Sequence, residues 1–303
     1  MKKILLFLCI IFCSIAPDLI SLELELIEGI GNLAYDTDRT LPLSDETNPG
    51  AFTPLYFPLA LARISGESGA VSWNAGYKRD PISRNWLFGI IRFEQDYFFA
   101  EGGPSLGLFN TKKLPLNPGI SAGFGLMLPG IIFIEASGSS TLAAIPMDKE
   151  GNYSLISADL SAGFWVPYVV CSFNIKLQNF TLRERTTLLI EDELIRYYFR
   201  ADVFTKNFPY TVRVDLGYQN LKRSYTSLEV DGSNIVQTNI TDEFKSLFVG
   251  LEGTFAVTPG LKLVLGAEMP IYFWSVRPMK DPSREIKFYE IRAGIILTVP
   301  VQN

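Results

Sequence analysis

The sequence contains no histidine among its 303 residues. Histidine is the commonest general base near neutral pH and a frequent zinc ligand, so its absence excludes histidine-dependent hydrolytic triads and zinc sites built on imidazole. Carboxylates and serines occur throughout, but none has the surroundings of an activated nucleophile. We therefore expect no enzymatic activity, no cofactor and no metal site.

Cysteine is scarce. Two of the three cysteines, Cys9 and Cys13, lie in the apolar N-terminal segment, and only Cys171 lies in the rest of the chain. A disulfide framework and a paired-cysteine metal or redox motif are both excluded. Cys171 falls on the apolar side of a predicted strand, where we interpret it as a small hydrophobic residue.

Basic residues are also in short supply. There are 27 Lys and Arg against 32 Asp and Glu, which gives a net charge of -5, and no cluster of Lys and Arg is present. A surface that binds phosphates needs a basic excess, so nucleic acid is excluded as a partner. Hydrophobic residues make up 48% of the chain and charged residues only 19%, which is a greasy composition for a water-soluble protein.

Continuous apolar runs are nearly confined to the N-terminus. Lys2 and Lys3 precede the apolar run 4–16, which is too short to span a membrane as a helix. This arrangement predicts a secretory signal peptide over residues 1–21. No linker-like segment divides the remainder, so we expect residues 22–303 to form a single domain.

Strict alternation of apolar and polar residues is the dominant feature of the rest. It is clearest over 154–166 and 169–178, which flank Pro167 and read as a hairpin. Strand side chains point to opposite faces with a period of two, so each arm has one apolar and one polar face. Alternation over about ten residues exceeds the usual strand of about five or six, and it matches a tilted strand that crosses a bilayer.

The same pattern recurs along the chain and predicts an all-β fold of about fourteen strands, or twelve to fourteen. The predicted strands are 22–35, 56–65, 71–78, 86–93, 97–109, 120–128, 131–142, 154–166, 169–187, 196–203, 210–218, 247–255, 261–269 and 286–299.

The connections also alternate. Those after odd-numbered strands are expected to be long and polar, and those after even-numbered strands short. We interpret 189–193 as a turn, and the polar segment 219–244 as a long excursion with its own hairpin signal at Asp231-Gly232. Bacterial outer-membrane barrels show this asymmetry, with short periplasmic turns, longer extracellular loops and an even number of strands.

Two other architectures fit the sequence less well. Residues 120–145 are long enough for one transmembrane helix, but Pro129, Gly130 and Glu135 fall inside that segment. A secreted β-sandwich would need a second layer to cover so many apolar faces.

The last predicted strand carries a short motif, a polar residue and a glycine followed by spaced hydrophobic residues: Arg292, Gly294, Leu297 and Val299. It is similar to the C-terminal assembly signal of outer-membrane β-barrels, although the chain ends in Pro-Val-Gln-Asn and not on an aromatic residue. The whole of 22–303 thus resembles an antiparallel transmembrane β-barrel of the bacterial outer membrane. It resembles porins most. A barrel of the fatty-acid-transporter type is the second choice, because that family carries an N-terminal plug and no plug segment is expected before the first strand here.

The polar faces of the predicted strands supply the candidate pore-lining residues. They are Lys78, Asp159, Lys176, Arg196, Arg200, Asp202, Arg213, Asp215, Glu252, Lys262, Glu268 and Arg292. Charges of both signs without partners or water would cost several kcal/mol each, so we expect a wet or ion-paired lumen.

These residues predict a channel for small polar solutes or ions. The alternatives are a non-conducting surface barrel, such as an adhesin or loop-display protein, and a transporter of hydrophobic compounds. The resemblance implies outer-membrane lipid, including lipopolysaccharide-type lipid, and the outer-membrane assembly machinery as partners. It also implies export to the outer membrane as a monomer or small homo-oligomer, with both termini periplasmic.

Overall fold

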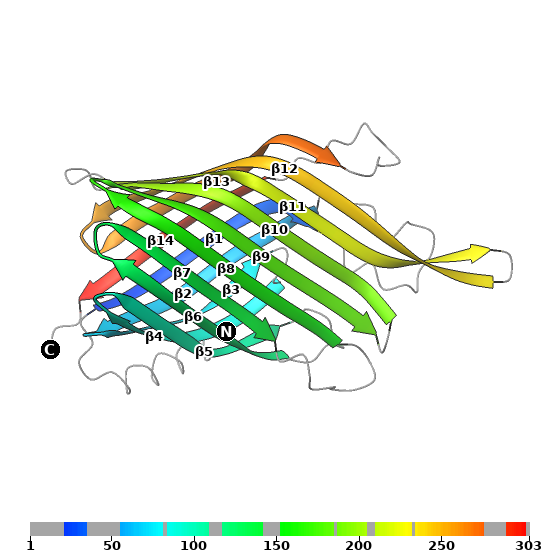
Figure 1. The fold of residues 1–303 in the computed structure, drawn as a ribbon, viewed down its shortest axis with the longest axis horizontal. Helices are drawn as coiled ribbons and strands as arrows, with labels where there is room; N and C mark the ends of the chain where they lie inside the picture. The colour runs from blue at the N-terminus through cyan, green and yellow to red at the C-terminus, as the bar shows by residue number, and fades with distance from the viewer. Residues whose placement is uncertain are drawn as a thin grey trace.

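The computed structural model describes residues 21–34, 55–80, 84–108, 117–141, 152–184, 187–204, 210–231, 234–275 and 289–300. Within them, fourteen strands form one closed antiparallel barrel. Each strand pairs with its neighbours in sequence, and the first pairs with the last (Figure 1). The predicted all-β barrel and its strand number are confirmed.

The strands in chain order are β1 (Ser21–Ala34), β2 (Leu55–Ser68), β3 (Val71–Asp80), β4 (Arg84–Gln95), β5 (Phe98–Leu108), β6 (Asn117–Leu128), β7 (Ile132–Thr141), β8 (Asn152–Val166), β9 (Val169–Glu184), β10 (Thr187–Phe204), β11 (Tyr210–Asp231), β12 (Asn234–Thr258), β13 (Leu261–Ser275) and β14 (Glu290–Pro300).

One end of the barrel carries the tight turns. Residues 69–70, 96–97, 129–131, 167–168 and 259–260 close hairpins there, and Ser21 pairs with Pro300 at the same end. Gly69, Gly130 and Tyr168 have the positive φ angles that such turns require. Both ends of the barrel wall therefore meet beside the short turns. The predicted signal peptide lies outside the described residues except for Ser21, which already begins β1.

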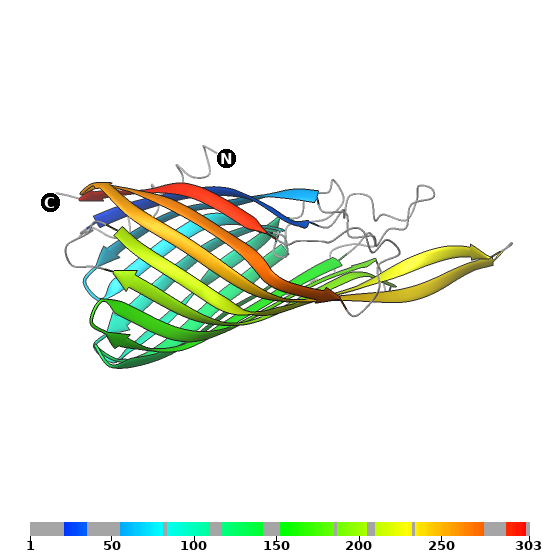
Figure 2. The ribbon, with the colours of Figure 1, turned by 90° about the horizontal axis from the view of Figure 1, so that it is seen from above.

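The opposite end is drawn out by long strands. β11 and β12 remain paired as far as Asp231 and Asn234, and this hairpin projects well beyond the rest of the barrel (Figure 2). The hairpin expected at Asp231-Gly232 is thus confirmed. However, most of the segment interpreted as a polar excursion is strand.

The turn predicted at 189–193 is wrong. These residues belong to β10, where Glu191, Asp192 and Glu193 pair with both β9 and β11. Their polarity does not signal a turn, because this part of β10 has polar neighbours, and Asn179 donates a hydrogen bond to Glu191. Consequently the connections 185–186 and 232–233, together with 81–83, are short. The expected length difference holds only for the other connections after odd-numbered strands.

Residues 120–145, considered as a possible helix, instead form β6 and β7 up to Thr141. No helix in the described part of the chain is long and apolar enough to span a membrane.

Alternation separates two surfaces. Large apolar side chains such as Ile134, Leu216, Leu251 and Leu265 are exposed on the outer face. Directly cross-strand residues share a face, so the row Ser137, Asp159, Lys176, Arg196 and Gln219 faces inward. The barrel wall therefore separates an apolar exterior from a largely polar interior, as in outer-membrane barrels.

Inward aromatic rings interlock with glycines on the next strand. Phe99 on β5 lies over Gly125 on β6, and Phe133 on β7 lies over Gly163 on β8, so that a Cβ at either glycine would overlap the ring. Glycine in a strand often marks such close approach. These contacts fill the interior near the short turns.

An apolar band lies on the inner face toward the ends of β8–β12 opposite the short turns. Leu155, Phe180, Leu194, Leu221 and Phe244 are each at most 5% exposed, and the strand registers place them in one diagonal run. The interior is thus not uniformly polar.

Candidate functional site: the barrel interior

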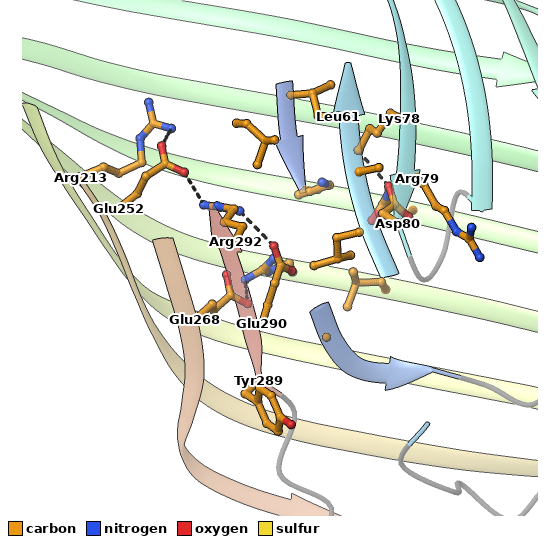
Figure 3. Close-up of a pocket in the computed structure, with 18 of the residues that line it drawn as sticks. Leu61, Lys78, Arg79, Asp80, Arg213, Glu252, Glu268, Tyr289, Glu290 and Arg292 are labelled. Carbon is orange, nitrogen blue, oxygen red and sulfur yellow. Dashed lines mark hydrogen bonds and ion pairs between the residues drawn. The ribbon is translucent and has the colours of Figure 1, made fainter. Parts of the chain in front are cut away.

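Ion pairs connect the inner faces of β10, β11, β12 and β14. Arg213 donates to Asp202 at 2.8 Å and to Glu252 at 3.1 Å. Arg292 lies 2.8 Å from the other oxygen of Glu252 and 3.1 Å from Glu290 (Figure 3). The result is one continuous chain of alternating charges.

Glycine makes this chain geometrically possible. Arg292 on β14 reaches across β13 to Glu252 on β12, and Gly266 is the β13 residue between them. A Cβ at Gly266 would come within 2.9 Å of Arg292 Nε. The missing side chain therefore leaves the path open for the guanidinium.

Two more ion pairs extend the network. Arg200 donates to both oxygens of Asp215 on the adjacent strand, at 2.8 and 2.9 Å. Arg196 donates to Glu268 at 2.5 Å, although the two residues lie on β10 and β13. Bidentate and charge-assisted hydrogen bonds of this kind are the strong ones in proteins.

Aromatic faces hold two of the guanidiniums. Arg196 lies 4.1 Å from the centre of the Phe248 ring, and Arg200 lies 5.2 Å from the Tyr198 ring. Cation–π contacts of this type contribute about 0.5–1 kcal/mol when exposed and more when desolvated. The arginines are therefore positioned on two sides, by carboxylates and by rings.

Three cavities are lined by side chains of the inner face. The largest, of about 440 Å³, is lined by charged residues from β1–β3 and β9–β14. It includes Gly31, Asp80 and Glu290, which lie at the ends of their strands opposite the short turns. We call it the upper cavity.

The other two are lined by residues of β3–β10. A middle cavity of about 200 Å³ shares Lys78, Lys176 and Gln178 with the upper cavity. A lower cavity of about 320 Å³ shares Glu101, Ser137 and Asp159 with the middle one. The middle cavity therefore borders on both of the others.

The structure brings together eight of the sequence-predicted residues in the ion-pair network described above. They are Arg196, Arg200, Asp202, Arg213, Asp215, Glu252, Glu268 and Arg292. Each of the four arginines contacts at least one of these acids, whereas Asp159 lies at the middle and lower cavities.

The three predicted lysines are placed differently. Lys78 forms an ion pair with Asp80 at 2.9 Å, whereas Lys176 forms none with any described residue. Lys262 lies beside the short turn at Gly260, away from the network, and its side chain is half-buried.

Sequence reasoning missed several interior charges, among them Arg63, Arg92 and Glu135. Arg63 lies 2.7 Å from Glu25 on the neighbouring strand, and Arg92 contacts Glu94 and Glu101. Glu135 lines the lower cavity. Alternation alone could have placed these residues on inner faces, but their pairing depends on strand register.

The four residues of the expected assembly signal lie on β14, with different surroundings. Arg292 belongs to the ion-pair network, and a Cβ at Gly294 would contact the side chain of Ile27. Leu297 is half-buried and Val299 is exposed on the outer face. Their role in assembly remains a prediction.

Among the described residues, no group of three or more Cys, Asp or Glu side chains is arranged to hold a metal ion.

The fold defines the class: a closed fourteen-strand antiparallel barrel of the bacterial outer-membrane type. No family model matches the sequence, and no curated protein matches it. Among solved structures, a deletion mutant of the TodX monoaromatic hydrocarbon channel has a TM-score of 0.50 at 11% identity, covering 95% of this chain and 92% of that one.

Other similar structures belong to the same class. A bacterial polysaccharide outer-membrane secretin has a TM-score of 0.47 at 8% identity, with 93% of this chain and 98% of that chain covered. An outer-membrane channel from Pseudomonas putida F1 has a TM-score of 0.41 at 5% identity, with 93% and 96% covered.

Proposed function

We propose that this protein is a narrow outer-membrane channel through which small polar or charged solutes pass passively. The observation that carries the proposal is the set of three neighbouring cavities, which share lining residues, inside a barrel whose outer face is apolar. Unpaired charges are costly away from water, so the charged interior supports a hydrated lumen. The ion-paired arginines narrow that lumen, which favours small solutes over a wide general pore.

The exterior supports a membrane location. Apolar side chains are exposed around the outer face, and Tyr97 and Tyr168 are exposed in the short turns, as in the aromatic belts at membrane interfaces. On this proposal the short-turn end, where β1 and β14 end together, is the periplasmic side. The assembly machinery would then reach both ends of the barrel wall from the periplasm.

A carrier of hydrophobic cargo is a weaker candidate. One similar structure is described as a monoaromatic hydrocarbon channel, but eight Arg and Lys side chains and five Asp and Glu side chains line the upper cavity here. Moving an apolar solute past them would leave those charges poorly solvated.

A non-conducting display barrel is the second candidate, and the projecting β11–β12 hairpin is what favours it. A liposome-swelling assay separates the two. Liposomes that contain the refolded barrel should swell in small sugars and amino acids, and the rate should fall steeply with solute size. Swelling no faster than in empty liposomes would reject the channel and leave the display function.

A further inference from the structure

Lys78 and Lys176 lie on facing walls of the barrel. In the ring of strands, five strands separate β3 from β9 on one side and seven on the other. Nevertheless both lysines line the upper cavity and the middle cavity. Their side chains must therefore approach the same region from opposite walls, at the junction between the two cavities.

The two lysines are not equally neutralised. Lys78 pairs with Asp80 at 2.9 Å (Figure 3). Lys176 makes no ion pair with a described residue, and its cross-strand neighbour Arg196 is another cation, already bound to Glu268. The neighbour on the other side, Asp159, lines the middle and lower cavities but not the upper one. Toward the upper cavity, Lys176 thus presents a positive charge that forms no ion pair with a described residue.

The surrounding surface reinforces this charge. Basic side chains outnumber acidic ones in the upper cavity lining, eight to five, although the whole chain carries a net charge of -5. Asp215 and Asp202, which pair with Arg200 and Arg213, are not part of that lining, whereas Glu252, the second partner of Arg213, is. The lower cavity has the opposite balance, with Glu101, Glu135 and Asp159 against Arg92 and Arg200.

From this arrangement we infer that the junction of the upper and middle cavities is an anion site, where Lys176 and Lys78 bind the carboxylate or phosphate group of a small solute. The inference rests on the proposed channel function and names its substrate class. A volume of about 440 Å³ accommodates a small organic anion. The ammonium of Lys176 would donate charge-assisted hydrogen bonds to the oxyanion, with Gln178 as a further polar neighbour.

The first test is the reversal potential of the refolded barrel in a planar bilayer across a potassium chloride gradient. The wild type should prefer chloride, and Lys176→Gln should lower the chloride-to-potassium permeability ratio by about sevenfold, because one unit charge at about 7 Å in a water-like dielectric changes the energy of each ion by about 0.6 kcal/mol with opposite sign. Lys176→Arg should retain it. Lys222→Gln is the matched control, because Lys222 is exposed on the outer side of β11, and it should change nothing.

The second test measures binding without conduction. Calorimetric titration of the detergent-solubilised barrel with inorganic phosphate and with succinate should show binding that weakens about tenfold or more in Lys176→Gln. Binding of phosphate alone would assign a phosphate-bearing solute, and binding of both anions a general oxyanion site. Each variant should still migrate more slowly on a gel after boiling than when unheated, which shows that the barrel is folded.

The outcomes separate the two proposals. A conducting barrel whose selectivity and anion binding are the same in wild type, Lys176→Gln and Lys222→Gln would refute the anion site and leave the channel standing. A barrel that does not conduct but binds phosphate or succinate through Lys176 would refute the channel and leave the anion site.

Discussion

Replacing Glu252 with glutamine should destabilise the barrel more than the loss of a single exposed ion pair would. Glu252 accepts from Arg213 at 3.1 Å through one oxygen and lies 2.8 Å from Arg292 through the other. Glutamine has nearly the same shape but no charge, and its amide nitrogen would face one of the two guanidiniums. The substitution therefore leaves two inward cations without their shared counter-ion.

The size of the effect follows from burial. Truncating one partner of a fully buried ion pair costs about 3–5 kcal/mol, but the Arg213 side chain is 36% exposed and that of Arg292 32%. Solvent screening reduces the loss, so we expect about 2 kcal/mol.

Glu94→Gln is the matched control. Glu94 lies 2.9 Å from Arg92, a distance similar to those at Glu252, but its side chain is 48% exposed against 15% for Glu252. An exposed pair contributes about 0–1 kcal/mol. Equilibrium unfolding in urea, in lipid vesicles and followed by tryptophan fluorescence, gives both free energies of unfolding. If Glu252→Gln costs no more than Glu94→Gln, the network does not stabilise the barrel in the way argued above.

Three further predictions concern the wall of the barrel. Gly125→Ala should destabilise it by about 1–3 kcal/mol because the new methyl overlaps the Phe99 ring. Gly89→Ala should not, because a Cβ there meets nothing within 4 Å. Equal losses of stability for the two variants in urea titrations would contradict the interlocking of ring and glycine. Leu251→Arg should lower the free energy of unfolding by about 2–4 kcal/mol and Val257→Arg by about 0–1 kcal/mol. Both outward side chains are 56% exposed, but Val257 lies beside a short turn and Leu251 in the middle of the wall. The reverse order would place the membrane at another level of the barrel. Replacing 224–241 by a two-residue Asn-Gly turn should leave a heat-modifiable, conducting barrel, because β11 and β12 still pair from Tyr210–Phe255 to Lys222–Glu243; loss of folding would show that the projecting hairpin is needed for assembly.

The barrel itself was predictable from alternation. On 154–166 and 169–178 every second residue is apolar, and the structure places that face outward. Alternation gave a false turn at 189–193. The strand continues there beyond the part of the wall with an apolar outer face, and its acidic residues cannot be told from those of a polar turn by sequence pattern. Alternation also missed inward apolar residues such as Leu221 and Phe244, which lie in the segment interpreted as a polar excursion.

The pairing inside the barrel was less accessible. Alternation selects the inward charges but does not say which of them meet. Arg196 and Glu268 are 72 residues apart in sequence, and two strands, β11 and β12, lie between the strands that carry them. Their contact depends on the stagger of β10 to β13 and on the length of arginine, neither of which is visible in a local pattern.

The most direct test of the account is the single-channel current of the detergent-purified, refolded protein in a planar bilayer. The account predicts discrete current steps whose size increases with salt concentration and stays small, as expected for a lumen narrowed by the arginines of β10, β11 and β14. A folded, heat-modifiable barrel that inserts but carries no current at any salt concentration would contradict it.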